Sequence, residues 1–396
     1  MKKIFFFGLL SSFISGQLFS QGCVPVRSTG SNIMERPSFN RKANSSKWIF
    51  SATNRYFRSF RHFVGNSEQK QRALNGTEVI NRSYTLDLNA TRILSKRWSV
   101  SMNVPVIANT RSSLYEHNGT RHTTGAYGVG DMRFTTYRWM LDPRKAKNGN
   151  IQAGLGIKLP TGNFKAQDYF YTGPSTRILG PVDQSIQLGD GGVGLISELN
   201  SYYTINRKIN LYSNLYYLVN PRETNGVSTA RGGPVNANTK AYGMDVMSVP
   251  DQYMARLGMN IRFNRLTLSA GARIDGVPAR DLIGGSNGFR RPGYIISAEP
   301  GFMYRASRFG MFLNVPVAIE RNRIQSVPDK IRSQLTGSYY KGDAAFADYV
   351  VNLGAFFSLP SLKKVKTINN TKPTNTYRSY NNCTRYSGCQ KRCLKL

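Results

Sequence analysis

Apolar residues occupy every second position in twelve segments of about ten residues each along this chain. In one of them, Tyr84, Leu86 and Leu88 alternate with Thr85 and Asp87. Successive side chains of a β-strand point to opposite faces of the sheet, so each segment has one apolar and one polar face. The pattern predicts an all-β fold, a transmembrane antiparallel up-and-down β-barrel of about twelve strands with lipid outside and a wet interior.

Very short turns and long polar loops alternate between these segments. The predicted short turns are 95–97, 142–148, 206–208, 264–265 and 306–308, and the predicted long loops are 59–78, 109–127, 163–188, 221–250, 277–292 and 323–347. Barrels of the bacterial outer membrane have short periplasmic turns and long extracellular loops, and an even strand number returns both barrel ends to the periplasm. The fourth segment, 129–141, alternates poorly, which predicts a β-bulge.

Large aromatic residues lie near both ends of the predicted strands, on the apolar face. Beside the short turns these are Trp48, Trp98, Trp139, Tyr203, Phe263, Phe309 and Phe357. Beside the long loops they are Tyr56, Tyr84, Tyr217, Tyr253, Tyr294 and Tyr349. Because tryptophan and tyrosine prefer the two membrane interfaces, two aromatic bands favour a membrane barrel over a soluble β-protein.

The two ends of the chain differ from its middle. Residues 1–22 have the pattern of a secretory signal peptide, with Lys2 and Lys3 ahead of an apolar stretch. We expect 23–46 to be a periplasmic lead-in or a plug, 47–360 the barrel, and 361–396 a basic, cysteine-containing periplasmic tail. At Cys23 ordinary signal-peptidase cleavage and lipidation both stay open, because residues 20–22 also form a weak lipobox.

The net charge of +33 would indicate nucleic-acid binding in a cytosolic protein. Export to the outer membrane excludes that class, and the basic side chains are expected to meet anionic lipid headgroups and glycolipid. The cationic tail could also bind an anionic periplasmic partner.

Four cysteines flank the predicted barrel, Cys23 before it and Cys383, Cys389 and Cys393 after it. The periplasm is oxidising, so at least one disulfide is expected. A pair within the tail and a bond from Cys23 to the tail both stay open.

Alternation places eight charged residues on the inward face: Asp87, Lys158, Glu198, Arg256, Arg273, Asp275, Glu299 and Glu320. If Asn264 and Arg265 form a two-residue turn, Arg256 faces Arg273 within the membrane span. Like charges directly opposite each other are destabilising, so Asp275 and Glu299 are expected as partners. Either the charges form an ionic ladder that braces the wall, or they form a ring that selects or binds anions.

No catalytic, cofactor or metal constellation is found in the sequence. His62, His117 and His122 fall in or beside outer loops, without a serine or aspartate at a recognisable spacing, and are expected to be solvated. The stretch Gly189-Asp190-Gly191 could hold a calcium ion but more often marks a turn.

Three glycine-rich stretches carry a family resemblance: GVGD at 128–131, GLGIKLPTG at 154–162 and LGDGG at 188–192, which open or end the fourth, fifth and sixth strands. With them the chain resembles the phenol-degradation meta-pathway transporter family, and more distantly the fatty-acid and toluene channels of the outer membrane. The resemblance implies passage of a small molecule and supplies no functional residue.

The expected function is an outer-membrane channel or transporter for small apolar or anionic solutes. The alternative is a closed barrel that serves as an envelope anchor or binding protein through its cationic tail. A membrane enzyme ranks last, since no triad can be assembled.

Overall fold

A computed structural model describes residues 46–146 and 148–360. The barrel is built from β1 (Ser46–Val64), β3 (Ile80–Ile93), β4 (Trp98–Ser113), β5 (His122–Val129), β6 (Arg133–Trp139), β7 (Gly149–Lys158), β10 (Gly194–Thr204), β11 (Ile209–Val219), β14 (Gln252–Phe263), β15 (Leu266–Val277), β16 (Gly293–Ala298), β17 (Gly301–Arg305), β18 (Phe309–Asn314), β19 (Val317–Arg323) and β20 (Ala344–Pro360). The loops carry β2 (Ser67–Glu68), α1 (Lys70–Leu74), β8 (Gln167–Tyr171), β9 (Arg177–Pro181), the 3₁₀ turn η2 (Gln184–Ile186), β12 (Thr224–Ser228), α2 (Ala237–Ala241), β13 (Val246–Ser248) and α3 (Val327–Thr336).

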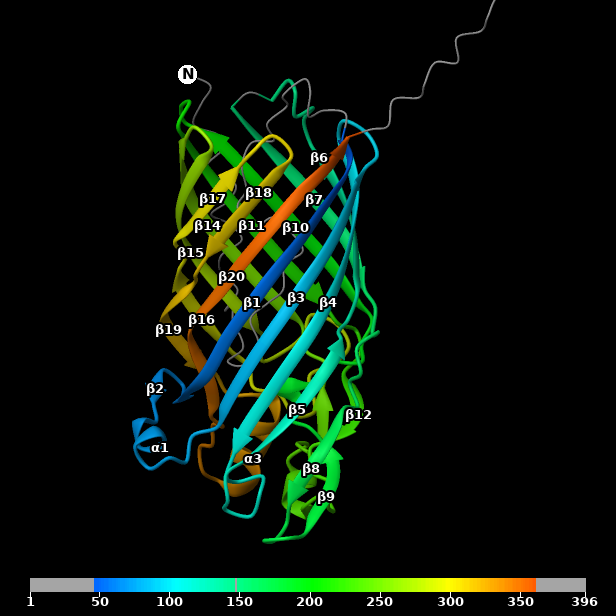
Figure 1. Cartoon of the computed structure of the whole chain (residues 1–396). Helices are drawn as coiled ribbons and strands as arrows, with labels where there is room; N and C mark the ends of the chain where they lie inside the picture. Colours follow the sequence, from blue (N-terminus) through cyan, green and yellow to red (C-terminus); the bar gives the residue numbers. More distant parts are fainter. Residues whose placement is uncertain (1–45, 147, 361–396) are drawn as a thin grey trace, which may run out of the picture. The chain divides into compact units, whose positions relative to one another are not determined.

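The barrel strands form one closed antiparallel sheet in which chain neighbours pair with each other (Figure 1). Three transmembrane strands are interrupted, so β5 with β6, β16 with β17 and β18 with β19 each count as one, and the barrel has the predicted twelve strands. β20 pairs with β1 from Ser46↔Pro360 to Phe63↔Ala344 and closes the cylinder. All five predicted short turns lie at one end of the barrel, at the top of Figure 1.

The outer face of the barrel is apolar and open to its surroundings. Side chains such as Leu155, 70% exposed, and Leu257, 64% exposed, project outward, while the preceding residues, Gly154 and Arg256, are buried inside. This is the predicted alternation of a barrel that meets lipid. The aromatic bands are present at both ends, with two corrections. Trp139 has the inward parity of Tyr137, and its ring contacts the buried Tyr202. Tyr253 is buried, with its ring stacked against Tyr217 beneath the loops.

A β-bulge interrupts the fourth transmembrane strand, as the poor alternation predicted. β4 pairs with β5 from Val106↔Val129 toward the long loops and with β6 from Asn103↔Arg133 toward the short turns. This leaves the three residues 130–132 opposite the two residues 104–105. The backbone N–H of Gly130 donates to Pro105 O at 2.8 Å within the bulge. A bulge bends the strand and re-aims side chains, and here it brings Asp131 to the inner side, 7% exposed.

A second bulge reverses the predicted direction of Glu320. β16 and β19 pair at Ile296↔Glu320 and then at Ser297↔Ala318, so Ile319 is an extra residue. The bulge shifts the alternation by one position, and Glu320 therefore lies on the outer surface, where it accepts a hydrogen bond from Tyr294 Oη at 2.8 Å. The inward position expected for Glu320 is wrong.

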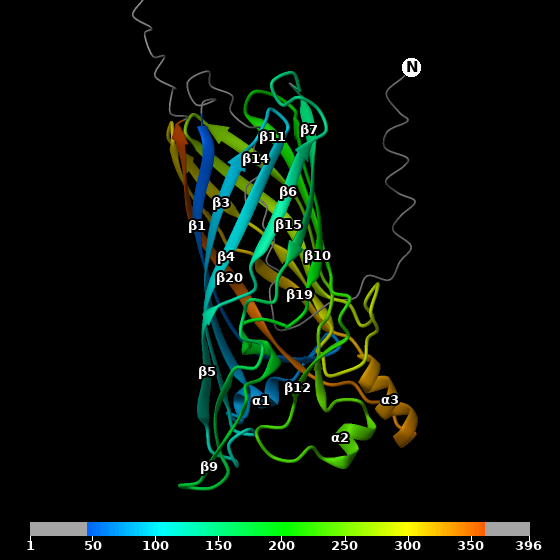
Figure 2. The ribbon, with the colours of Figure 1, turned by 90° about the vertical axis from the view of Figure 1, so that its right-hand side faces the viewer.

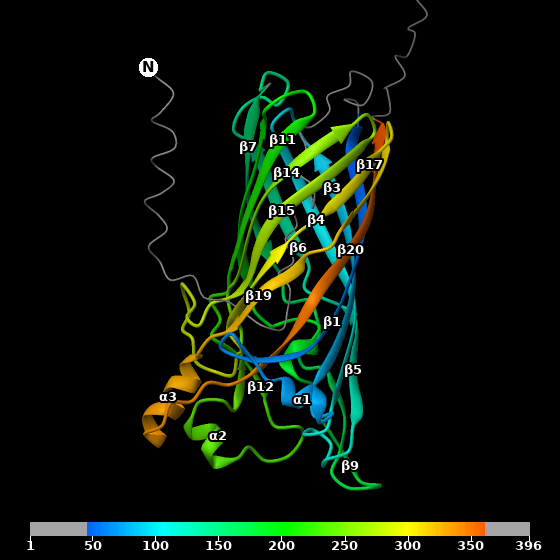
Figure 3. The same cartoon turned by 90° about the vertical axis from the view of Figure 1, so that its left-hand side faces the viewer.

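The last two strands separate toward the loop end. β19 and β20 share only the pair Val317↔Tyr349, seen where the two ribbons diverge in Figure 3. Beyond it the Arg321 side chain spans the seam, donating to Ala347 O at 3.1 Å and to Asp348 at 2.6 Å. A guanidinium here replaces the missing ladder hydrogen bonds.

The long loops cover the other end of the barrel, the lower end in Figure 2, where β9, β12 and all three α-helices lie. α3 begins at a capping box, in which the Ser326 hydroxyl and the Asp329 carboxylate each accept the other's backbone N–H, and it ends at Gly337 in the left-handed region with φ of 67°. Among the described residues, no helix is long and apolar enough to cross a membrane.

Candidate functional site: the barrel lumen and its outer mouth

All seven candidate lumen residues are buried on the inner side of the wall. They are Asp87, Lys158, Glu198, Arg256, Arg273, Asp275 and Glu299. Around them, neutral polar residues such as Thr85, Asn200 and Asn260 are buried on the same face. The structure brings four of the seven together and places the other three at separate positions around the wall.

Arg256, Arg273, Asp275 and Glu299 form one charged cluster. Arg256 and Arg273 are direct partners across β14 and β15, the register that a two-residue turn requires. Arg256 Nη1 lies 3.3 Å from Glu299 Oε1, and Arg273 Nε lies 2.7 Å from Asp275 Oδ1. Two carboxylates therefore balance two guanidiniums, which is the arrangement of the ionic ladder.

Glu198 and Asp87 lie in separate polar networks. Glu198 accepts hydrogen bonds from Tyr137 Oη at 2.7 Å and from Asn214 Nδ2 at 3.0 Å. Asp87 lies 3.9 Å from Arg55 Nη2 and accepts from Asn103 at 3.4 Å. Asp87 thus has partners on both adjacent strands, whereas Glu198 has one on the adjacent β11 and one on β6, beyond β7. The charged lining extends around the wall.

Inward aromatic rings lie against the wall, over glycines of neighbouring strands. A Cβ added to Gly258 would lie 2.5 Å from the Tyr212 ring, and one added to Gly310 would lie 2.2 Å from the Phe356 ring. Only glycine admits such a close ring, and the flat ring protects the exposed sheet backbone. These large side chains therefore occupy less of the lumen than rings directed across it would.

The three stretches that carry the family resemblance meet at a single place on the wall. Lys158 forms an ion pair with Asp190 and lies 3.6 Å from Asp131. The Asp131 carboxylate accepts the backbone N–H of Gly162 at 3.0 Å and of Asp190 at 3.2 Å. This Asp131 anchor holds both ends of the loop that follows β7. The LGDGG stretch lies in that loop and precedes β10, which begins at Gly194 rather than at residue 188 as expected.

Between these ends the loop folds into the mouth of the barrel and packs on the inner wall. Its side chains and two wall residues form an apolar cluster of Ile107, Ala126, Ala166, Val182, Ile186 and Leu188. The loop also reaches the next long loop, because Gln184 Nε2 donates to Ser248 O at 2.9 Å. Beneath it lies a cavity of about 100 Å³ lined mainly by polar residues, among them Arg55, Arg133, Lys158 and Asp190.

A cluster of ion pairs connects the outer loops. Asp183 is fully buried and lies within 2.8 Å of Arg231, 2.7 Å of Arg291 and 3.6 Å of Arg111, which come from separate segments. Burial alone would raise the pKa of Asp183, but the charges of Arg111, Arg291 and Arg231 hold it well below its usual value. Glu116 pairs with Arg111 and Arg231 in the same cluster. Burial alone would raise the pKa of Glu116, but the charges of these two arginines lower it below its usual value.

Two histidines at this end, His62 at the end of β1 and His117 in the β4–β5 loop, are buried, contrary to the solvated state expected for them. His62 is 5% exposed and His117 is 1% exposed. The His117 ring stacks on Phe170 with centroids 5.4 Å apart, and burial lowers its pKa. The loops that cover the outer end bury both side chains, a contact that alternation within a strand cannot reveal.

Several residues at this end were not identified from the sequence. Asp131 lies in the GVGD stretch and could have been found from the bulge expected there. Asp183, Arg231 and Arg291 lie in irregular loops, where no periodicity predicts which side chains meet. The described residues contain no group of three or more histidines and acids placed to hold a metal ion. Cys23, Cys383, Cys389 and Cys393 lie outside the described residues.

No family model and no curated protein matches the sequence. Among solved structures, the chain is similar to an outer membrane channel from Pseudomonas putida F1, with a TM-score of 0.53 and 10% identity over 80% of this chain and 96% of that one. The chain shares the β-barrel fold of that structure. The CymD monoaromatic hydrocarbon channel, with a TM-score of 0.37 and 8% identity over 80% of this chain and 89% of its own, is too distant to support an argument. The same holds for the Ralstonia pickettii toluene transporter TbuX, with a TM-score of 0.37 and 9% identity over 79% and 90% of the two chains.

Proposed function

We propose that this protein is an outer-membrane channel for small solutes, with an outer mouth that the inward-folded loop closes in the conformation described. The observation that carries the proposal is the charged and polar lining inside a closed barrel with an apolar exterior. The name of the similar Pseudomonas putida structure, an outer membrane channel, is consistent with it.

The lining favours a channel over a solid anchor. Burying charges costs free energy even when they are paired, and an apolar core of the same volume is often more stable. A barrel that served only as an anchor would gain from such a core. The wall instead contains the charged cluster of Arg256, Glu299, Arg273 and Asp275, as expected where water and solutes pass.

The contacts of the loop favour a gate. The Asp131 anchor fixes its two ends, while its middle is held by an apolar cluster and by hydrogen bonds such as Asn109 Nδ2 to Ile186 O at 3.3 Å. Asp183 in this middle part also pairs with Arg231 and Arg291. Loops held by side-chain contacts open at lower free energy than the hydrogen-bonded sheet that carries them. Opening would connect the cavity under the loop with the outside while the barrel stays intact.

Conductance tests the proposal directly. Purified protein in planar bilayers should conduct ions, and a thiol reagent that carries a sulfonate should reduce the current of Asn260→Cys, whose side chain is buried in the lumen. The matched control is Leu257→Cys on the outer face, 64% exposed, which should keep its current. Wild-type protein treated with the reagent controls for the native cysteines.

Folded protein, shown by heat-modifiable migration, that conducts nothing at any voltage would overturn the channel. Equal block of both cysteine variants would show that the current does not pass through this lumen.

A further inference from the structure

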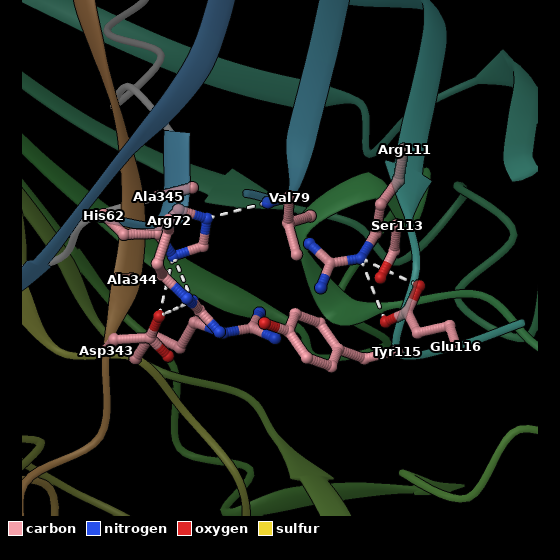
Figure 4. A pocket seen from close by; sticks show the side chains of 11 residues that line it. His62, Arg72, Val79, Arg111, Ser113, Tyr115, Glu116, Asp343, Ala344 and Ala345 are labelled. Atoms are coloured by element: carbon pink, nitrogen blue, oxygen red, sulfur yellow. Dashed lines mark hydrogen bonds and ion pairs between the residues drawn. The ribbon is translucent and has the colours of Figure 1, made fainter. Parts of the chain in front are cut away.

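A second cavity lies at the loop end of the barrel, between the ends of β1, β4 and β20 and the α1 loop (Figure 4). Its volume is about 160 Å³. Val79, Ala344 and Ala345 line its apolar side, and Tyr115, 59% exposed, stands at its edge. A space of this size accommodates one six-membered ring or a short aliphatic chain.

The polar side of the cavity is cationic. Three guanidiniums, of Arg72, Arg111 and Arg291, line it with two carboxylates, of Glu116 and Asp343. Adding the adjacent Arg231 and Asp183 gives four positive and three negative charges, so the site keeps an excess of one positive charge. A single negative charge would neutralise the site.

Histidine does not change this balance. His62 Nε2 accepts the backbone N–H of Val79 at 2.9 Å, so that nitrogen carries no proton. Nδ1 therefore carries the ring proton and donates a hydrogen bond to Asp343 Oδ2 at 2.7 Å. His62 is therefore neutral and orients Asp343.

The Arg72 side chain extends over the opening of this cavity. It contacts both Asp343 and His62 through Nη1, and its Cζ lies 5.3 Å from the centroid of the Tyr115 ring. Figure 4 shows the guanidinium extending from Asp343 toward Tyr115. A planar guanidinium can bind a carboxylate through two parallel hydrogen bonds.

Ser113 provides an independent sign of a ligand. Ser113 is fully buried and lines the cavity. Its hydroxyl oxygen makes no hydrogen bond to any residue in the described part of the chain. A buried hydroxyl without a partner destabilises the folded protein. A ligand oxygen in the cavity would supply the missing partner.

We propose that this cavity binds the carboxylate of a small organic acid with a ring-sized apolar body, and that it serves as a capture site at the outer mouth. The carboxylate meets Arg72 and the Ser113 hydroxyl, while the body packs on Val79, Ala344 and Ala345. The role in capture rests on the proposed channel, and it specifies an anionic substrate class for it. A neutral molecule of the same shape leaves the positive charge unbalanced and binds more weakly.

Titration of the purified full chain in detergent, with benzoate and with benzyl alcohol as its neutral counterpart, tests the site. Wild type should bind benzoate about tenfold more tightly than the alcohol, since hydrogen bonds to a charged group contribute about 1.5–3 kcal/mol. Ser113→Ala and Arg72→Gln should each weaken benzoate binding by about tenfold. The matched control is Ser112→Ala, because Ser112 is adjacent and buried but does not line the cavity.

Equal affinity for acid and alcohol, or full benzoate affinity in folded Arg72→Gln, would overturn the site. Arg72 lies on a short surface helix, so its replacement keeps the test available even if Ser113→Ala does not fold. Benzoate binding by a protein that does not conduct would overturn the channel and keep the site. Conductance without benzoate binding would overturn the site alone.

Discussion

Arg256 on β14 lies directly opposite Arg273 on β15, with both side chains buried inside the barrel. Glu299 and Asp275 offset the repulsion between them. The pair of arginines is thus part of a balanced cluster, and its electrostatic effect on a passing ion depends on four charges rather than two.

Replacing both arginines with glutamine should destabilise the barrel and change its selectivity. The double variant leaves two acids buried without these cations, and breaking one buried pair costs about 3–5 kcal/mol. We expect a lower melting temperature and a shift of the reversal potential toward cations. The matched control is Arg207→Gln with Arg265→Gln, which removes two exposed charges at the short turns.

An unchanged melting temperature with a large loss of anion preference would contradict the ladder and favour the anion ring. Unchanged selectivity with a lower melting temperature would assign the cluster to bracing alone.

Asp131→Ala should loosen the gate. The change removes the acceptor for the N–H groups of Gly162 and Asp190, and an unsatisfied buried group costs about 1–3 kcal/mol. The open population of the loop should rise by about tenfold, which single-channel recordings measure as open time. Asp142→Ala, in the short turn between β6 and β7 at the other end of the barrel, should leave the open time unchanged. Identical open times for Asp131→Ala and wild type would contradict the role of this anchor.

Lowering the pH should weaken the ion pair between Asp343 and Arg72 of α1, and so loosen the α1 loop. Burial raises the pKa of this carboxyl, but the hydrogen bond from His62 and the charge of Arg72 outweigh burial and hold it at about 2. The unfolded value is about 3.9, so the folded state is stabilised above that pH and loses the contribution as pH falls from about 4 toward 2. Hydrogen exchange of 65–79 should differ between wild type and Asp343→Asn at pH 5 and converge near pH 2. A difference that stays constant across this range would exclude titration of Asp343 as its cause.

Single cysteines should report which barrel end faces outward. Ser175→Cys in the β8–β9 turn and Asn238→Cys in α2 should react with an impermeant maleimide on intact cells, whereas Lys145→Cys in a short turn should not. All three sites are exposed, so access through the membrane decides the result. Labelling of Lys145→Cys alone would invert the topology.

The sequence by itself determined the barrel, because the alternation of side chains along a strand is local. It was enough to predict twelve strands, the short turns, the bulge before β6 and the inward position of Asp87, Lys158 and Glu198. The two-residue turn at Asn264 also determined the register that opposes Arg256 to Arg273, since a hairpin turn sets the pairing of both strands.

Only the tertiary structure decided what lies at the outer end. Glu320 faces outward because one extra residue at Ile319 shifts the alternation, a change no rule of spacing predicts. Asp131, Lys158 and Asp190 meet because three strand ends converge there, and Asp183 gathers arginines from separate segments. Such contacts depend on how irregular loops fold against one another, and loops have no repeating geometry from which a sequence pattern could predict their partners.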